Sequence, residues 1–292
     1  MNAGDVERSY AWCTTIARSQ AKNFYYSFLL LDLPRRRAMC AMYAFMRYCD
    51  DLSDDDLPDA GPGRDCFDAN DRAARIELWR RNLDLALAGR EPEGILWPAF
   101  VHTVKKYRIP HHYFFEMIEG ISSDLKPRRI ESFDELYDYC YHVASVVGLT
   151  IIHIFGFDDS DAPAALALAE KCGIAFQLTN ILRDIREDAE KGRVYLPAED
   201  LDRFGVSLPF RRDQAFLNLM EFEASRAREY YRESAPLTGM IDAKSRASLR
   251  ALIGIYSRLL DRIVAADFDV LSQRVRVATW EKLWILAKSR IR

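Results

Sequence analysis

The spacing of apolar residues along this 292-residue chain constrains its fold more than any other feature. Long segments carry them at intervals of three and four, which places them on one side of an α-helix, whereas few stretches alternate as a half-buried strand does. Pro110 and Pro163 suit helix starts, where the missing N–H costs little. No shift in composition marks a domain boundary, so we expect residues 1–292 to form one all-α domain. The clearest helical segment contains Leu249, Leu252, Ile253, Tyr256, Leu259, Leu260 and Ile263.

Composition excludes several classes of function. The formal net charge of −3 comes with no dense basic stripe, so we expect no nucleic-acid partner. The six cysteines are scattered and contain no C-x-x-C, which favours buried thiols in a reducing compartment. The five histidines show no metal-ligand spacing. The polar, acidic start does not resemble a signal peptide. No apolar run reaches the roughly 18–20 residues of a membrane helix, so we expect a cytoplasmic protein.

Two pairs of aspartates carry the strongest chemical signal. Asp184 and Asp188 are four apart in a segment that reads as helix and share a face with Asn180. Asp50 and Asp54 repeat the spacing. Carboxylates one turn apart with a neutral oxygen donor suit a hard cation, and Mg²⁺ typically combines one or two carboxylates with substrate phosphate. The two stripes are Tyr43, Arg47, Asp50, Asp54 and Gln177, Asn180, Asp184, Asp188.

Each pair also has a simpler explanation. A single Asp-x-x-x-Asp is common, and an acidic run such as residues 50–56 is typical of a solvated helix end. Both stripes, however, follow strongly apolar stretches, so we expect the carboxylates at the mouth of the interior. Two acidic faces with adjacent arginines, Arg47 and Arg183, predict a metal-clamped diphosphate between them.

Four ordered motifs between about residues 14 and 285 resemble those of the squalene and phytoene synthases, which join two prenyl diphosphates head to head. The resemblance implies an isoprenoid-synthase fold, a helical bundle around a central apolar cavity. The motifs are AKNFYYSFLLL at 21–31, YAFMR at 43–47 followed by Asp50 to Asp54, YCYHVASVVG at 139–148, and Asn180 to Asp188 continuing to Pro197.

The resemblance also implies roles for individual residues. Mg²⁺ would bridge the diphosphate to the two acidic motifs, and Tyr139 is the leading candidate to stabilise a carbocation or help a proton depart. On the residues alone, Tyr139 could be a core tyrosine with a satisfied hydroxyl, and each basic residue could form a surface ion pair. The implied metal ligands are Asp50, Asp54, Asn180, Asp184 and Asp188. The implied substrate-binding residues are Lys22, Phe24, Phe28, Tyr43, Arg47, Val143, Val147, Gly148, Gln177, Asn180, Arg183, Tyr256 and Arg274.

The reaction implied by the resemblance has two halves. Two prenyl diphosphates first form a cyclopropane intermediate, presqualene or prephytoene diphosphate, which then ionises, rearranges and is quenched. We expect farnesyl diphosphate as substrate and a squalene-type product, with phytoene synthesis from geranylgeranyl diphosphate as the alternative. NADPH use is possible, since family members that need it lack the G-x-G-x-x-G fingerprint, which is also absent here.

Three other kinds of protein compete with this interpretation. A chain-elongating prenyltransferase and a terpene cyclase would also use aspartate-rich helices and Mg²⁺, and the third is a non-catalytic helical scaffold. Chain-elongating prenyltransferases typically carry Asp-Asp-x-x-Asp in both motifs, whereas the second motif here is Asp184-x-x-x-Asp188. A non-catalytic helical scaffold would be expected to lose its acidic ligands, yet all four aspartates are present.

The C-terminal segment, residues 280–292, suggests a separate property. Trp280, Leu283 and Trp284 fall near one helical face, and Lys288 and Arg290 add positive charge. Such a helix can lie at a membrane surface, here the inner face, although it could equally pack on the domain.

Overall fold

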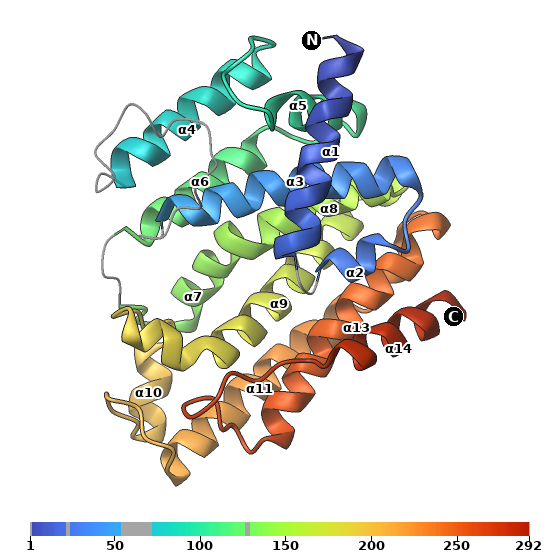
Figure 1. The fold of residues 1–292 in the computed structure, drawn as a ribbon. Helices are drawn as coiled ribbons and strands as arrows, with labels where there is room; N and C mark the ends of the chain where they lie inside the picture. The colour runs from blue at the N-terminus through green and yellow to red at the C-terminus, as the bar shows by residue number, and fades with distance from the viewer. Residues whose placement is uncertain (1, 22–23, 54–71, 126–128, 292) are drawn as a thin grey trace.

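The computed structural model describes residues 2–21, 24–53, 72–125 and 129–291, and this part of the chain is helical (Figure 1). It contains no strand, only two isolated bridges, Arg129 to Val194 and Phe157 to Ile241. The prediction of an all-α fold is confirmed. The helices are α1 (Ala3–Gln20), α2 (Phe24–Phe28), α3 (Leu33–Ser53), α4 (Arg72–Leu87), α5 (Trp97–Lys106), α6 (His112–Ser123), α7 (Phe133–Cys140), α8 (Val146–Phe155), α9 (Ala162–Glu190), α10 (Ala198–Phe204), α11 (Gln214–Ser234), α12 (Leu237–Met240), α13 (Ala243–Ala265) and α14 (Thr279–Ile291).

Local signals fix several helix ends. The Ser132 side chain accepts a hydrogen bond from the Glu135 N–H and caps α7, and Asp213 caps α11 through the Phe216 N–H. Pro163 lies in the first turn of α9, as its sequence position predicts. Gly156 follows α8 with φ of 82°, a left-handed conformation that glycine adopts without steric cost.

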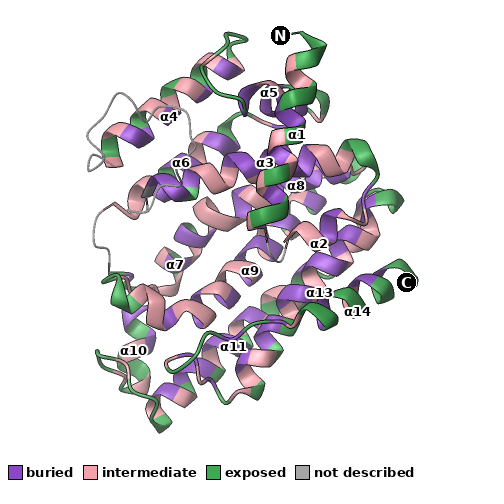
Figure 2. Cartoon of the chain, in the orientation of Figure 1, coloured by how far each residue is buried: buried purple, intermediate pink, exposed green. Residues whose placement is uncertain are grey.

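Helix α9 runs through the middle of the bundle (Figure 1). It packs against α11 and α13 on one side and α7 and α8 on the other. Figure 2 shows its central part as buried or half-buried, in contrast to the exposed outer side of α14. Because α9 contacts helices on several sides, the position of each residue in its helical repeat determines which side chains face the interior of the bundle.

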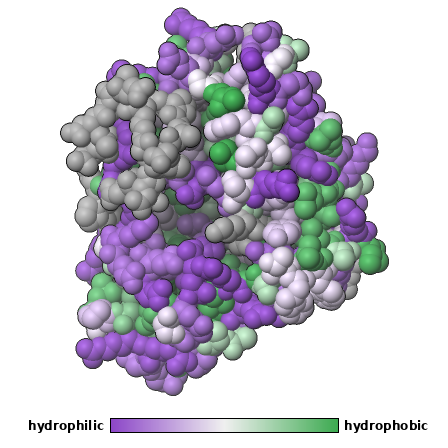
Figure 3. Space-filling view, viewed as in Figure 1, coloured by the Kyte–Doolittle hydropathy of each residue, from purple (hydrophilic) through white to green (hydrophobic). Residues whose placement is uncertain are grey.

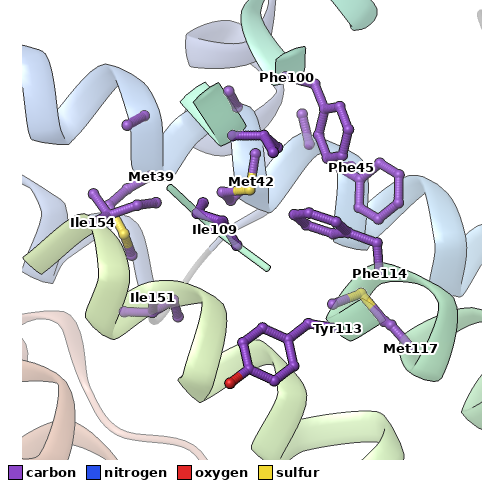
Figure 4. Packing of buried hydrophobic residues seen from close by; sticks show 14 of the residues in the cluster. Met39, Met42, Phe45, Phe100, Ile109, Tyr113, Phe114, Met117, Ile151 and Ile154 are labelled. Atoms are coloured by element: carbon purple, nitrogen blue, oxygen red, sulfur yellow. The ribbon is translucent and has the colours of Figure 1, made fainter. Parts of the chain in front are cut away.

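Two large apolar clusters form the core. One joins α3, α5, α6 and α8; Figure 4 shows Phe45 of α3 against Phe100 and Phe114, whose ring centroids lie 4.5 and 5.4 Å from its own. The other joins α7, α9, α11 and α13. Each fully buried side chain of this size stabilises the fold by roughly 1.5–3 kcal/mol.

A single helical run extends from Phe133 to Phe155 and is long and apolar enough to cross a membrane. Acidic residues in its first turns interrupt the apolar run, which is why the sequence prediction did not identify it. More than half of its most apolar window is buried inside the bundle, and it packs against α6 and α9. We interpret it as a core helix.

This run contains a π-helical turn, Tyr141–Ser145, between α7 and α8. A Cβ atom on Gly173 of α9 would lie 2.5 Å from the Ser145 Cα, and one on Gly120 of α6 would lie 3.0 Å from the His142 backbone. Two glycines therefore let α9 and α6 approach the turn closely. Such turns are frequent at functional sites, and this one begins two residues after Tyr139.

Candidate functional site

A cavity of about 380 Å³ lies between the two apolar clusters and opens at an acidic mouth. The space-filling view is hollowed near its centre, with hydrophobic atoms inside the hollow (Figure 3). Arg183 and Arg274 are not among the lining residues, and Lys22 and Asp54 lie outside the described part of the chain. The predicted site residues that line the cavity are Phe24, Phe28, Tyr43, Arg47, Asp50, Tyr139, Val143, Val147, Gly148, Gln177, Asn180, Asp184, Asp188 and Tyr256.

Helix α9 supplies one wall along the whole depth of the cavity. Its lining residues extend from Ala169 to Asp188, a stripe of about 28 Å at the helical rise of 1.5 Å per residue. The deep part carries small and apolar side chains, and the outer part carries Gln177, Asn180 and the two aspartates. The polarity of the cavity therefore changes along one helix, from apolar interior to acidic mouth.

Two arginines form ion pairs with Asp184. Arg183 Nε donates to its Oδ1 at 2.8 Å and Arg183 Nη2 pairs with its Oδ2. Arg274 Nη2 lies 3.0 Å from the same Oδ1, and Arg274 Nη1 lies 2.6 Å from Glu187 Oε2. These two arginines thus contact the acidic motif rather than the cavity, so their immediate effect is to orient the Asp184 carboxylate.

Asp188 and Asn180 present oxygen atoms suited to a cation. Burial, with the nearby Asp184 charge, raises the pKa of Asp188 to about 7, so an incoming positive charge would favour its ionised form. The buried Asn180 Oδ1 has no hydrogen-bond partner among the described residues. In that same part of the chain no three acidic, His or Cys side chains converge on one point. Carboxylate and amide oxygens of this kind fit a divalent ion that also binds substrate phosphate.

The opposite wall comes from the end of α3. Asp50 lies exposed at the mouth, while Asp51 is buried and pairs with Arg47 one turn earlier. The buried Arg47 Nε makes no hydrogen bond within the described structure. Arg47 thus uses Nη2 in an ion pair, while its Nε–H remains a hydrogen-bond donor next to the cavity that the residue lines.

Aromatic rings surround the space below the mouth. The Phe24 ring lies 6.3 Å from Tyr43 and 5.5 Å from Tyr256, measured between centroids. Phe176 stacks on Tyr256 at 4.4 Å. Burial raises the pKa of Tyr256 to about 12 and that of Tyr43 further, so both hydroxyls stay neutral. Neutral aromatic faces stabilise a cation and exclude water.

A second aromatic pair is anchored by Asp124, which directly follows α6. The Tyr139 hydroxyl donates to Asp124 Oδ2 at 3.1 Å, and the Tyr195 hydroxyl donates to Oδ1 at 3.2 Å. The two rings stack at 4.8 Å. Burial, reinforced by the Asp124 charge, raises the pKa of both tyrosines. Each hydroxyl donates a hydrogen bond to Asp124, which leaves lone pairs on the Tyr139 oxygen for a cation.

The deep end of the cavity is apolar and adaptable. Met39, Met42 and Met46 of α3 face it together with Met117 of α6. Thioether side chains are unbranched and fill irregular space. On the other side a Gly148 Cβ would lie 3.1 Å from the Ala169 carbonyl oxygen, so glycine lets α8 and α9 approach closely there.

Several lining residues were not predicted as site residues. Lys191, Arg193 and Tyr195 follow α9 and belong to the matched KGRVYLP segment, so the motif itself was an available signal. Asp124 offered no such signal, because only the fold brings it to Tyr139 and Tyr195. The methionine stripe shows the ordinary spacing of a core helix.

Comparison with known proteins places these features in a family. The squalene/phytoene synthase profile matches residues 17–281. The 15-cis-phytoene synthase of Synechococcus elongatus is 34% identical over 304 residues, covering 98% of this chain and 94% of that protein. The chloroplastic phytoene synthase 3 of Zea mays is 34% identical over 300 residues, covering 99% of this chain and 67% of that protein.

Two solved structures support the same family. A dehydrosqualene synthase in complex with ligand superposes with a TM-score of 0.87 at 28% identity, covering 99% of this chain and 97% of the other. The squalene synthase HpnC from Alicyclobacillus acidocaldarius gives a TM-score of 0.79 at 25% identity, covering 91% and 97%. The chain belongs to the squalene/phytoene synthase family, prenyltransferases that join prenyl diphosphates head to head.

Proposed function

We propose that this protein condenses two molecules of geranylgeranyl diphosphate into a phytoene-type, forty-carbon product. The support is that the matching curated relatives named above are phytoene synthases at 34% identity, whereas the dehydrosqualene and squalene synthase structures are 28% and 25% identical. The expectation of farnesyl diphosphate, drawn from the sequence, is therefore less well supported than its alternative.

The observation that carries the catalytic proposal is the change of polarity along α9, from apolar depth to acidic mouth. A diphosphate at the mouth and a prenyl chain in the depth match this change. Enzymes of this family use a divalent metal with diphosphate substrates. We expect Mg²⁺, because the side chains at the mouth carry hard oxygen atoms: Asp50 on one wall and Asn180, Asp184 and Asp188 on the other. Bound metal would stabilise the negative charge of the departing diphosphate.

Basic side chains complete the mouth. Lys191, Arg193 and Arg47 line it and can neutralise phosphate oxygens as the C1–O bond breaks. Arg183 and Arg274 pair with the Asp184 carboxylate and orient it, so we assign them a positioning role.

The allylic cation needs a dry, electron-rich pocket. Phe24, Tyr43, Phe176 and Tyr256 provide aromatic faces just inside the mouth, each worth roughly 0.5–2 kcal/mol to a well-placed cation. The Tyr139 hydroxyl, held by Asp124, presents its oxygen lone pairs to the same space. These groups stabilise positive charge without supplying water, which favours carbon–carbon bond formation over hydrolysis.

A second candidate, condensation of two farnesyl diphosphates, is favoured by the TM-score of 0.87 to a dehydrosqualene synthase. A non-catalytic scaffold is disfavoured, because Asp50, Asp184 and Asp188 all line the mouth of one cavity.

Release of pyrophosphate from geranylgeranyl diphosphate and Mg²⁺ tests the catalytic proposal. Asp50→Asn and Asp184→Asn should each lower the rate by about 10²–10³-fold, the scale of losing one group that stabilises developing charge. Asp202→Asn, on the exposed surface of α10, is the matched control and should leave the rate unchanged. Wild-type rates in both site variants would refute the assignment.

A further inference from the structure

Helix α14 has two apolar faces. Its inner face packs Ile285 and Leu286 against Ala251 and Ile255 of α13. Glu281 lies under the same side, 3% exposed, where its carboxylate pairs with Arg258 at 2.7 Å and Arg262 at 2.8 Å. The inner face alone explains why this helix folds onto the bundle.

The outer face is apolar as well and is exposed. Trp280, Leu283, Trp284 and Ile291 are 66%, 53%, 59% and 86% exposed, and their spacing places them along one side of the helix. In the described part of the chain seven large hydrophobic side chains are exposed, and these are four of them. Figure 3 shows hydrophobic and near-neutral residues gathered over α13 and α14 at the lower right. Fold stability does not require such a concentration, because these side chains remain in water.

Charge on the outer face has one sign. Lys288, Arg290 and the preceding Arg276 are exposed, and the Lys288 ammonium lies 4.9 Å from the centre of the Trp284 ring. Glu281, the single acidic residue of the helix, is buried in its ion pairs. The outer face therefore combines two tryptophans with positive charge.

We propose that the outer face of α14 docks on the surface of an anionic lipid bilayer. Tryptophan suits the boundary between headgroups and acyl chains because its ring is apolar and its N–H is polar. Each Lys or Arg near an anionic membrane surface adds attraction of about 1 kcal/mol, and the inner leaflet of a cell membrane carries such charge. A second copy of this chain fits less well, since a two-fold contact through this face would bring two basic patches together.

The position of α14 gives the docking a consequence that rests on the proposed function. The helix covers the outer sides of α2 and α13, and the inner sides of these two helices line the cavity through Phe24, Phe28, Leu249, Leu252 and Tyr256. Docking would bring this wall next to the bilayer, the phase that dissolves a forty-carbon hydrocarbon.

Vesicle sedimentation of the full chain, without substrate, tests the docking independently of catalysis. We expect binding to vesicles of phosphatidylcholine with phosphatidylglycerol and weak binding to phosphatidylcholine alone. The double variant Trp280→Ala, Trp284→Ala should bind the anionic vesicles on the order of tenfold more weakly, equivalent to about 1.4 kcal/mol. Both tryptophans are mostly exposed, so its melting temperature should match the wild type.

The matched control is the double variant Leu33→Ala, Leu208→Ala, which removes two other exposed apolar side chains, 62% and 55% exposed, and should bind like the wild type. Equal binding by the tryptophan variant, or no binding of the wild type to anionic vesicles, would overturn the proposal. So would a wild-type dimer that the tryptophan variant converts to monomer without a change in lipid binding, because the occupant would then be a second copy.

Discussion

Replacing Gly173 by alanine should destabilise the protein and disturb the site. The new Cβ would lie 2.5 Å from Ser145 Cα, 2.8 Å from Ser145 N and 2.9 Å from the Ala144 carbonyl oxygen. Carbon atoms normally approach to about 3.5–4.0 Å, so α9 and the π-helical turn must separate by about 1 Å. All three neighbours are backbone atoms, which cannot rotate away.

The expected cost follows from these contacts. Overpacking of this kind costs typically 1–3 kcal/mol, and the better helix propensity of alanine offsets about 1 kcal/mol. Because the overlap is with backbone atoms, we take the upper part of that range, about 2–3 kcal/mol, which leaves a net loss of about 1–2 kcal/mol. For a chain of this length that loss should lower the melting temperature by roughly 2–3 °C. Because the turn follows Tyr139 and contains the cavity-lining Val143, we expect pyrophosphate release to fall as well.

Calorimetry and the pyrophosphate assay on Gly173→Ala measure both effects. Gly239→Ala is the matched control, since Gly239 lies in helix α12 and a Cβ there meets nothing within 4 Å. That control should melt at or above the wild-type temperature. Wild-type melting and activity in Gly173→Ala would refute the close packing of α9 on the turn.

Three further perturbations have defined outcomes. The pKa of Asp188 is about 7 in the folded protein and near 4 in the unfolded chain, so the metal-free fold should lose stability as the pH rises between these values. Over the same range the affinity for Mg²⁺ should increase, because the carboxylate becomes ionised. Asp188→Asn should flatten both trends, as measured by thermal melts and by Mg²⁺ titrations. Tyr139→Phe removes the 3.1 Å hydrogen bond to Asp124 and should lower the free energy of unfolding by about 0.5–1.5 kcal/mol in a denaturant titration. Product formation should fall more than substrate binding. An unchanged product yield would assign the hydroxyl to packing alone. Burial raises the pKa of Glu223 to about 8, although Arg226 opposes the shift, so the stability conferred by the neutral carboxyl is lost as the pH rises from about 4.5 to 8. The melting temperature of Glu223→Gln should therefore rise relative to that of the wild type across this range. A relative fall would contradict the assignment.

What the sequence could predict depends on whether a feature lies within one helix. Gln177, Asn180, Asp184 and Asp188 share a face because the helical period alone dictates it, and the structure places all four along the cavity. Arg183 shows the limit of this reasoning. It is adjacent to Asp184 and thus about 100° around the helix, so its guanidinium reaches the carboxylate from the side instead of lining the cavity.

Features made by several helices were beyond prediction from spacing. Asp124 meets Tyr139 and Tyr195 across 15 and 71 residues, and no periodicity encodes such contacts. The π-helical turn likewise breaks the 3.6-residue period where Gly120 and Gly173 of other helices approach it. Asp54 and Lys22, predicted as a metal ligand and a diphosphate ligand, lie outside the described residues, so those two assignments stay predictions.

The proposed condensation of two geranylgeranyl diphosphates can be tested by mass spectrometry of the organic extract after the protein is incubated with geranylgeranyl or farnesyl diphosphate and Mg²⁺. We expect a forty-carbon hydrocarbon from the twenty-carbon substrate, formed equally with and without NADPH because phytoene requires no hydride. A thirty-carbon product from farnesyl diphosphate alone would assign the protein to the squalene branch. Intact substrate in both reactions would contradict the catalytic proposal itself.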